Sequence, residues 1–412
     1  MKNIYLTILT CFCLHVIFSQ NTWTSIASFG GGERERAISF VIGDRAYVGT
    51  GIDSANICRK DIWEYDPGTN SWTQKADVPG TARRDAIAFS IGNRGYVGTG
   101  LNGVIAWTGS KKDDFYEYNP ITNLWTAKKD WEGNFGGGIY YASAFATSTK
   151  GYLVCGKLGS SYYSGELWEY DPLVNDWIKK ANFPPGTRYG ASAFSIAGKG
   201  YVGCGSDEDY YRNDFYEYDP QSNVWTQKAD FPGSPRFNAV GLSIMERGYI
   251  GMGTDGGYQK DFYEYNPLTD NWMQKANLPA SERRSCVGFT IGNYGYVGIG
   301  KGVDGVKRGM YKYKPFFLFI GEDDELRLTA TVSPNPVNQN AAICFTGNKN
   351  IASAQLIVFN SKGAAVLLDD NNSSSTFNFQ RNNLPSGLYL YEIKTIDKDG
   401  VTNFISGKLY LI

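Results

Sequence analysis

A tryptophan-containing segment repeats through most of this chain, and its period constrains the fold more than any other feature. Successive tryptophans of the segment are 49, 53, 52, 48 and 47 residues apart. They are Trp23, Trp72, Trp125, Trp177, Trp225 and Trp272. A period near fifty residues predicts a propeller or a solenoid, because one such unit cannot bury its apolar face without a neighbour.

One repeat reads as four short strands. In the second repeat they cover residues 83–92, 95–100, 114–120 and 123–129. Each is alternating or wholly apolar and ends at Gly, Pro, Asn or Asp, the residues expected of hairpin turns. Four antiparallel strands in one unit predict a propeller blade, and therefore an all-β fold.

The number of repeats and the two incomplete ends predict how the ring closes. The tyrosine of the second strand recurs as Tyr47, Tyr96, Tyr152, Tyr201, Tyr249 and Tyr296. The last repeat stops after its third strand at residues 309–315, whereas residues 21–29 form a lone fourth strand. We therefore predict a six-bladed propeller over residues 21–315, in which residues 21–29 supply the outer strand of the blade formed by residues 283–315.

These features resemble the kelch repeat, in which an Arg enters the first strand, a Tyr precedes glycines in the second, and a "YDP" turn and a Trp follow. The resemblance covers residues 21–315 and implies the propeller architecture of galactose oxidase. One departure is consistent, because the family's Gly-Gly doublet is here Gly-x-Gly, as in Gly98-Thr99-Gly100. The shared aromatic residues fill the wedge between blades, so function is expected where the repeats differ.

The N-terminal residues 1–20 resemble a secretory signal peptide. Lys2 precedes an apolar run over residues 4–18, and the small and polar Ser19 and Gln20 follow. The run is too short to span a bilayer, and no later segment is long enough, so we expect no transmembrane span. The alternative is an uncleaved amphipathic N-terminus.

Removal of residues 1–20 also removes the only histidine, His15. The mature chain then lacks the Ser/His and Cys/His nucleophile pairs and the histidine ligands of zinc and copper, including the copper chemistry of galactose oxidase. Its five cysteines have no metal-site or disulfide-framework spacing, so we expect packed, free thiols. We predict neither a cofactor nor a metal site. The net charge of -1 indicates neither nucleic acid nor an anionic membrane as a partner.

The repeat ends near residue 315, and after a linker at residues 316–328 a second pattern covers residues 329–412. Short strands at 354–360, 387–395 and 403–412, with a polar run at 369–375 between them, predict a small immunoglobulin-like β-sandwich. The stretches "SPNP" (333–336), "LPSGLYLY" (384–391) and "GKLYLI" (407–412) resemble the C-terminal sorting domain of type IX secretion. This resemblance implies a bacterium of the Bacteroidota, the secretion machinery as a partner, and a secreted or outer-surface location. The alternative is an ordinary adhesive module.

The loops that lead into the first strand and out of the second emerge on one face of a propeller, and here they vary. Aromatic side chains gather in them and suit stacking against sugars or anchoring of a protein. The candidates are Trp107, Trp131, Tyr162, Tyr163, Tyr210, Tyr211 and Tyr258, of which Trp131 lies in the irregular loop 128–141.

An arginine enters the first strand of five blades and is a second candidate ligand contact. The five are Arg34, Arg83, Arg188, Arg236 and Arg283, and the third blade has Ile139 instead. Such guanidinium groups hold carboxylate, sulfate or phosphate bidentately. The alternative is a structural role, since the kelch pattern places an Arg here and Glu33, Glu35, Asp85 and Glu282 lie nearby.

Three functions remain open at the level of sequence. The preferred one is a non-catalytic binding module for a glycan or an extracellular protein, because no compact acid/base constellation is evident. The second is an enzyme resembling the six-bladed kelch epimerases that mutarotate sialic acid, with Glu132 or Glu208 as acid/base and an arginine on the carboxylate. The third is a structural surface component. Calcium binding by the acidic residues 206–209 is a further alternative, although their spacing is not that of a calcium loop.

Overall fold

The computed structural model describes residues 21–103, 109–133, 137–315, 329–346, 351–360, 365–371, 376–397 and 402–412. The signal peptide predicted at residues 1–20, the linker predicted at 316–328 and Trp107 lie outside the described residues. The chain divides into two compact units after Pro315, and each is described by itself below.

Six four-stranded antiparallel sheets occupy the first unit and form the predicted blades. The first blade comprises β2 (Ile38–Ile42), β3 (Arg45–Gly49), β4 (Ile62–Asp66) and β5 (Ser71–Lys75). The second comprises β6 (Ile87–Ile91), β7 (Arg94–Gly98), β10 (Phe115–Asn119) and β11 (Leu124–Ala127). The third comprises β12 (Ser143–Ala146), β13 (Gly151–Lys157), β14 (Tyr163–Asp171) and β15 (Asp176–Lys179).

The remaining blades repeat this order from the inner strand to the outer one. The fourth comprises β16 (Ser192–Ile196), β17 (Lys199–Gly203), β18 (Phe215–Asp219) and β19 (Val224–Lys228). The fifth comprises β20 (Val240–Ile244), β21 (Arg247–Gly251), β22 (Phe262–Asn266) and β23 (Asn271–Gln274). The sixth comprises β24 (Val287–Ile291), β25 (Tyr294–Gly298), β28 (Met310–Lys314) and β1 (Thr22–Ile26). Two short ribbons, β8 (Leu101–Asn102) with β9 (Ser110–Lys111) and β26 (Lys301–Gly302) with β27 (Gly305–Val306), extend two loops.

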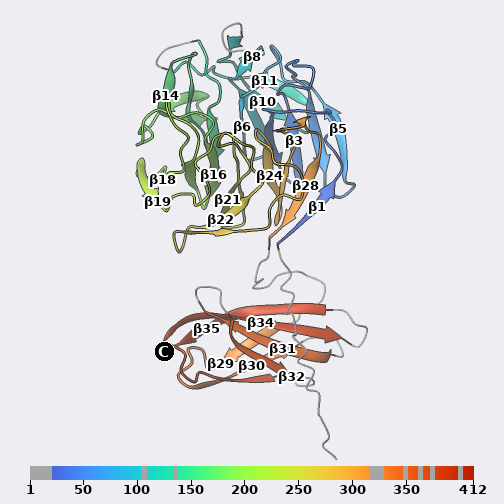
Figure 1. Ribbon diagram of the computed structural model, residues 1–412, viewed down its shortest axis with the longest axis vertical. Coiled ribbons are helices and arrows are strands. Elements are labelled where there is room, and N and C mark those ends of the chain that lie inside the picture. Colours follow the sequence, from blue (N-terminus) through green and yellow to red (C-terminus); the bar gives the residue numbers. More distant parts are fainter. Residues whose placement is uncertain are drawn as a thin grey trace, which may run out of the picture. The chain divides into compact units, whose positions relative to one another are not determined.

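The sixth blade confirms the predicted closure of the ring. β1 pairs antiparallel with β28 (Figure 1), and in this register Trp23 lies opposite Tyr313. The first strand in sequence is thereby the outermost strand of the last blade, and the ends of the ring are joined by a hydrogen-bonded ladder.

The repeated tryptophan joins each blade to the one before it. In every blade the indole Nε1 donates a hydrogen bond to a backbone carbonyl just after the preceding outer strand, over 2.8–3.1 Å. The acceptor of Trp72 is Ala27, for example, and that of Trp23 is Ala276. Because the six bonds include the closing blade, the tryptophans form a continuous series around the ring.

A repeated glycine admits an aromatic ring from the neighbouring blade. Phe40 of the first blade packs against Gly95 of the second, where an added Cβ would lie 2.2 Å from the phenyl ring. Phe40 in turn stacks on Tyr47 with their ring centroids 5.0 Å apart. The same contact with a phenylalanine occurs at Gly151, Gly200 and Gly248. In these four blades the glycine before the strand tyrosine is therefore needed for space, and the wedge between blades is filled by aromatic rings.

The second unit is a β-sandwich of the predicted kind. One sheet holds β29 (Thr329–Ser333), β30 (Asn340–Thr346) and β33 (Thr376–Gln380). The other holds β32 (Ala365–Asn371), β31 (Ile351–Phe359), β34 (Gly387–Asp397) and β35 (Thr402–Leu411). Both sheets contribute to one core, which includes Ile343, Val358 and Ile393. The polar run at 369–375 was expected between strands, but its first residues belong to β32, where they pair with β31.

Among the described residues, no helix combines the length and apolarity that a membrane crossing requires. The five cysteines outside the N-terminal segment are free. Burial raises the pKa of Cys155 and of Cys204 to about 12, so both thiols are protonated and unreactive at neutral pH.

Candidate functional site

Four of the five predicted arginines form buried ion pairs within their own blades, and we name them the paired arginines. They are Arg34, Arg83, Arg188 and Arg236. Each places two guanidinium nitrogens on one carboxylate at the start of the third strand. The acceptors are Asp61, Asp114, Asp214 and Asp261, with contacts at 2.7 and 3.1 Å for Arg34 and at 2.6 and 2.9 Å for Arg188. Their terminal nitrogens are thus occupied, and this geometry favours the structural alternative.

The Gly-x-Gly departure from the kelch pattern belongs to the same arrangement. The middle residue has a positive φ in all six blades, from 51° at Ile299 to 61° at Cys155, although the third blade has Val154 in place of the first glycine. In the five blades that have the arginine, this carbonyl accepts a hydrogen bond from it, as Thr50 does from Arg34 Nη1 at 2.6 Å. The left-handed residue therefore turns its carbonyl toward the arginine, and the pair joins three strands of one blade.

Two blades depart from this pattern. The third has Ile139 in place of the arginine, and its carboxylate Glu166 accepts from Trp168 and Lys179 instead. In the sixth, Arg283 forms no ion pair with a carboxylate among the residues that the structure describes. It donates to the carbonyls of Ser281 and Ile299 and lies over Tyr311. Arg283 is 3% exposed, so it too is a framework residue.

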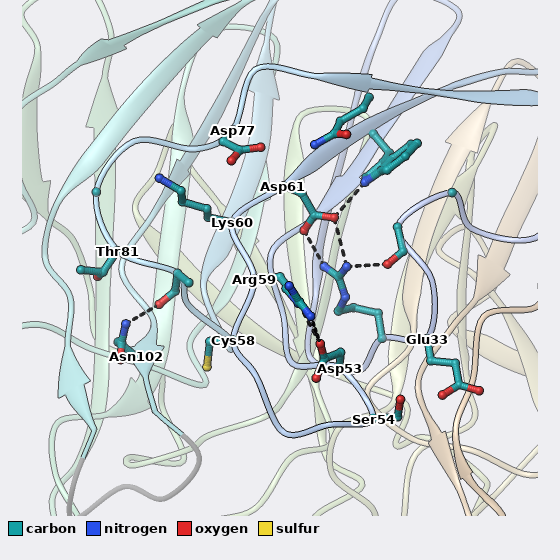
Figure 2. Close-up of a pocket in the computed structure, with 17 residues that line it drawn as sticks. Glu33, Asp53, Ser54, Cys58, Arg59, Lys60, Asp61, Asp77, Thr81 and Asn102 are labelled. Carbon is teal, nitrogen blue, oxygen red and sulfur yellow. Dashed lines mark hydrogen bonds and ion pairs between the residues drawn. The ribbon is translucent and has the colours of Figure 1, made fainter.

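A hollow with a volume of about 900 Å³ lies beside the first of these pairs. Figure 2 shows Asp61 accepting from the Arg34 guanidinium and the Trp63 indole, while Arg59 reaches Asp53. The hollow therefore holds charges of both signs, and its two arginines are paired with Asp61 and Asp53.

The structure corrects the role predicted for Trp131. Its side chain is 1% exposed and packs edge-on against Trp168, in the core between the second and third blades. Residues 134–136 of the irregular loop lie outside the described residues. The Trp131 N–H donates to the Asp113 carbonyl, and the N–H groups of Phe183 and Phe231 make the equivalent bond in the next two blades. All three aromatic side chains are buried, so Trp131 is not available to a ligand.

The predicted tyrosines separate into two groups. Tyr163 stacks on Tyr189 at 5.3 Å and Tyr211 stacks on Phe237 at 5.1 Å, while Tyr258 lies under Arg284. Tyr162 and Tyr210 instead remain 74% and 66% exposed. The first group thus extends a larger aromatic assembly, whose other members sequence analysis did not single out.

The carboxylates proposed for catalysis or calcium lie elsewhere. Glu132 is exposed and pairs with Lys129, and Glu208 is exposed in its loop. Asp207 accepts from two backbone amides and from Arg212, so its oxygens are used to close that loop. No group of three or more His, Cys, Asp or Glu side chains that could hold a metal occurs among the described residues.

A closed ring of backbone hydrogen bonds surrounds the propeller axis where the first strands begin. One residue from each blade donates its N–H to the carbonyl of the preceding blade's equivalent residue, over 2.8–3.2 Å. This inner ring consists of Arg36, Asp85, Tyr141, Gly190, Asn238 and Ser285. All six have φ between 53° and 58°. Their backbones are therefore equivalent, while their side chains are all different.

The residues immediately before them form an outer ring. They are Glu35, Arg84, Tyr140, Tyr189, Phe237 and Arg284, and each bridges to the strand-exit loop of its blade. We name the two rings together the mouth. Beneath it, a cavity of about 200 Å³ is lined by small residues at the start of the inner strands, such as Ser39, Ala88 and Ser143, and by those just before them, such as Ala37 and Ala86. The mouth is where the repeats differ, and it is the candidate functional site.

One half of the mouth carries charges that neutralise each other. Asp85 pairs with Arg84 and, at 3.6 Å, with Arg36, while Glu35 lies 3.6 Å from Arg36 and 3.7 Å from Lys301. Burial raises the pKa of Asp85, and the two arginines oppose that rise. Burial opposes the charge of Arg36 as well, yet Asp85, Tyr141 and Glu35 outweigh it and raise the pKa of Arg36.

The other half is aromatic, and we name its five rings the aromatic wall. Its members are Tyr141, Tyr163, Tyr189, Phe237 and Tyr211. Tyr189 is central, with ring centroids 6.1 Å from Tyr141, 5.3 Å from Tyr163 and 6.0 Å from Phe237. Two cations border the wall: Lys157 lies over Tyr163 and Tyr189, and Arg284 lies over Phe237 and Tyr258.

Comparisons with known proteins agree with this architecture. The model of the KLHDC2/KLHL20/DRC7 Kelch-repeats domain matches residues 87–300. The chain belongs to the kelch-repeat family. A solved structure entitled "Structure of YjhT" is similar to this kelch propeller, with 16% identity and a TM-score of 0.58. That match covers 69% of this chain and 96% of the other, and at this identity it shows the fold alone. The search of curated proteins finds no match.

The second unit has its own match. The secretion system C-terminal sorting domain matches residues 331–406. This kelch protein therefore carries a type IX sorting domain, which implies interaction with the secretion machinery and delivery to the cell surface or outside the cell.

Sequence analysis missed most of the mouth, although a signal for it was present. The two residues after each framework arginine differ in every repeat, as in Glu35-Arg36, Arg84-Asp85 and Phe237-Asn238. The pattern drew attention to the shared arginine instead. Tyr189 lies beside a strand entry rather than in a long loop. Tyr141 is the last residue of the irregular loop 128–141, in which Trp131 was the predicted contact.

Proposed function

We propose that this exported kelch propeller is a binding module that recognises a carbohydrate at its mouth. The aromatic wall carries the proposal, because flat aromatic rings suit the apolar face of a sugar ring. The mouth also suits a slender ligand better than a broad protein surface, since the residues of both rings are buried or half-buried. A protein partner remains the alternative that the exposed Tyr162 and Tyr210 would serve.

A glycan array probed with the purified protein tests this proposal. A bound glycan should lose about 2 kcal/mol of binding free energy in Tyr189→Ala, since a central aromatic contact is removed. Tyr210→Ala is the matched control, because its ring is 66% exposed and lies outside the aromatic wall. Loss in the control but not in Tyr189→Ala would place the site on the rim. An array without any bound glycan would favour a protein partner or a structural surface component.

A second candidate function is mutarotation of a sugar, as in the kelch epimerases considered above. Asp85 favours it, because it is a buried mouth carboxylate whose pKa is raised by burial and which lies beside Tyr141. Asp85 therefore replaces Glu132 and Glu208 as the candidate acid/base. The wild-type protein should accelerate the exchange between anomers that NMR measures, and Asp85→Asn should lose this acceleration. An exchange rate that the wild-type protein leaves unaltered would exclude this activity.

A further inference from the structure

The cations of the mouth differ in whether the protein neutralises them. Arg36 and Arg84 both pair with Asp85. Arg284 and Lys157 form no ion pair with any carboxylate among the described residues. Aromatic faces hold both of them, and an aromatic face stabilises a cation without cancelling its charge. The aromatic half of the mouth is therefore positively charged on two sides.

Unsatisfied hydrogen-bonding atoms gather at one of these cations. Arg284 Nε, Asn238 Nδ2 and Ser285 Oγ are buried and have no hydrogen-bond partner among the residues that the structure describes. The three residues belong to neighbouring blades, since the Ser285 N–H donates to the Asn238 carbonyl at 3.0 Å. Buried donors without partners are costly, and native proteins keep few of them. The three atoms are a guanidinium N–H, an amide N–H and a hydroxyl, and a ligand group rich in acceptor oxygens would complement them.

The second cation lies on the other side of the central ring. Lys157 Nζ is 4.6 Å from the centroid of Tyr189 and 4.8 Å from that of Tyr163. Burial without a charged partner lowers the pKa of Lys157. Glu208 and Asp209 lie close enough to raise the pKa of Tyr163, but both are exposed, so water screens them. A sugar ring stacked on Tyr189 is thus bordered by positive charge.

We propose that Arg284, Asn238 and Ser285 form an anion subsite of the mouth, and that the ligand is a carbohydrate bearing a carboxylate or a sulfate group. Arg284 supplies the charge, while the amide of Asn238 and the hydroxyl of Ser285 supply further hydrogen bonds to the anionic oxygens. Lys157 strengthens the attraction from the opposite side of Tyr189. This inference rests on the proposed carbohydrate function.

Calorimetric titrations of the purified full chain with four probes test the subsite. The probes are a neutral chitin tetrasaccharide, a hyaluronan tetrasaccharide with carboxylates, a sulfated lactosamine oligosaccharide, and inorganic sulfate. Wild type should prefer one acidic sugar to the neutral one, and its affinity should fall about tenfold in Arg284→Gln. Binding of the hyaluronan tetrasaccharide would identify the anionic group of the ligand as a carboxylate, and binding of the sulfated oligosaccharide would identify it as a sulfate.

Two further variants keep the result interpretable. Arg247→Gln removes an arginine beyond the far end of the inner strand β20, so it should bind like wild type. Asn238→Asp places a negative charge in the subsite and should weaken acidic sugars while leaving a neutral sugar unaffected. The midpoint of urea unfolding shows whether Arg284→Gln folds. If it does not, Asn238→Asp takes its place in the test of the subsite.

The outcomes separate the subsite from the carbohydrate function. Equal affinity for the neutral and acidic sugars would overturn the subsite and leave the carbohydrate function standing. If no sugar binds but inorganic sulfate binds wild type and not Arg284→Gln, the subsite stands and the carbohydrate function is overturned. If sulfate and the acidic sugars bind neither protein, or bind both equally, the subsite is overturned.

Discussion

Arg83 and Arg84 are adjacent in sequence, yet they belong to two different parts of the molecule. Arg83 is fully buried, with both terminal nitrogens on Asp114, and its equivalents recur in four other blades. Arg84 lies in the mouth, where it pairs with Asp85 and donates to the Gly103 carbonyl at 2.9 Å. Its equivalents are Glu35, Tyr140, Tyr189, Phe237 and Arg284. The comparison teaches that repetition marks the framework, while the position beside it varies and forms the proposed site.

The largest effect is expected on the framework at alkaline pH. In five blades the strand tyrosine donates to a glutamate of the next strand, as Tyr47 does to Glu64 at 2.5 Å. Burial and these glutamates raise the pKa of each such tyrosine above the ordinary value of 10.0. A raised pKa in the folded state means that stability is fully present below about pH 10 and is lost as pH rises. Urea unfolding should therefore show stability falling by about 1.4 kcal/mol per tyrosine per pH unit above that point.

The control for the alkaline effect is Tyr47→Phe. Removing one titrating hydroxyl should make the decline of unfolding free energy with pH less steep, by the contribution of one group. A free energy of unfolding that stays constant between about pH 10 and 11 would show that these tyrosines do not govern stability. The sixth blade offers an internal contrast, because Tyr296 faces Lys312 instead of a glutamate.

The next largest effect is expected from a paired arginine. Arg236→Leu should lower the free energy of unfolding by about 3 kcal/mol, because it leaves Asp261 without its buried partner. The double variant Arg236→Leu/Asp261→Leu should recover part of that loss, since no charge is stranded. Urea unfolding measures both. Ligand affinity at low denaturant should stay unchanged, so a large loss of affinity in a folded Arg236→Leu would contradict the framework role.

The smallest effect is expected from a glycine of the mouth. Gly190 has a φ of 58°, as do its non-glycine equivalents within a few degrees, so the backbone conformation alone does not require glycine. An added Cβ would lie 2.6 Å from Asn238 Oδ1. Gly190→Ala should cost about 1 kcal/mol of stability and weaken ligand binding by displacing Asn238.

Gly292→Ala is the matched control for that substitution. Its φ is 57°, yet no atom of the described part of the chain lies within 4 Å of an added Cβ. Both variants therefore carry the same backbone strain, and only Gly190→Ala should affect binding. Equal affinities of the two variants, measured by calorimetry, would separate Asn238 from recognition.

Much of the fold could be predicted from the sequence, because strands and turns within one repeat depend on residues that are close together in the chain. The spacing of the tryptophans, the turn residues and the lone strand at residues 21–29 predicted six blades and the closure of β1 on β28, as observed. The candidate site was predicted less well. Tyr163, Tyr211 and Tyr258 do reach the mouth region, but the paired arginines and Trp131 belong to the framework. The repetition of an arginine shows that each blade uses it. It does not show whether its guanidinium group is already bound to a carboxylate of the same blade.

The sequence by itself determined the blade count, the closing strand and the sorting domain, since each depends on patterns within one repeat or one short segment. Only the tertiary structure decided which side chains meet. Tyr189 lies 104 residues after Asp85, and Arg284 lies 95 residues after Tyr189. Closure of the ring brings the blades of all three residues around one axis. The physical reason is that the six equivalent backbones bond to each other in a ring. That ring gathers one variable position from every repeat into a single mouth.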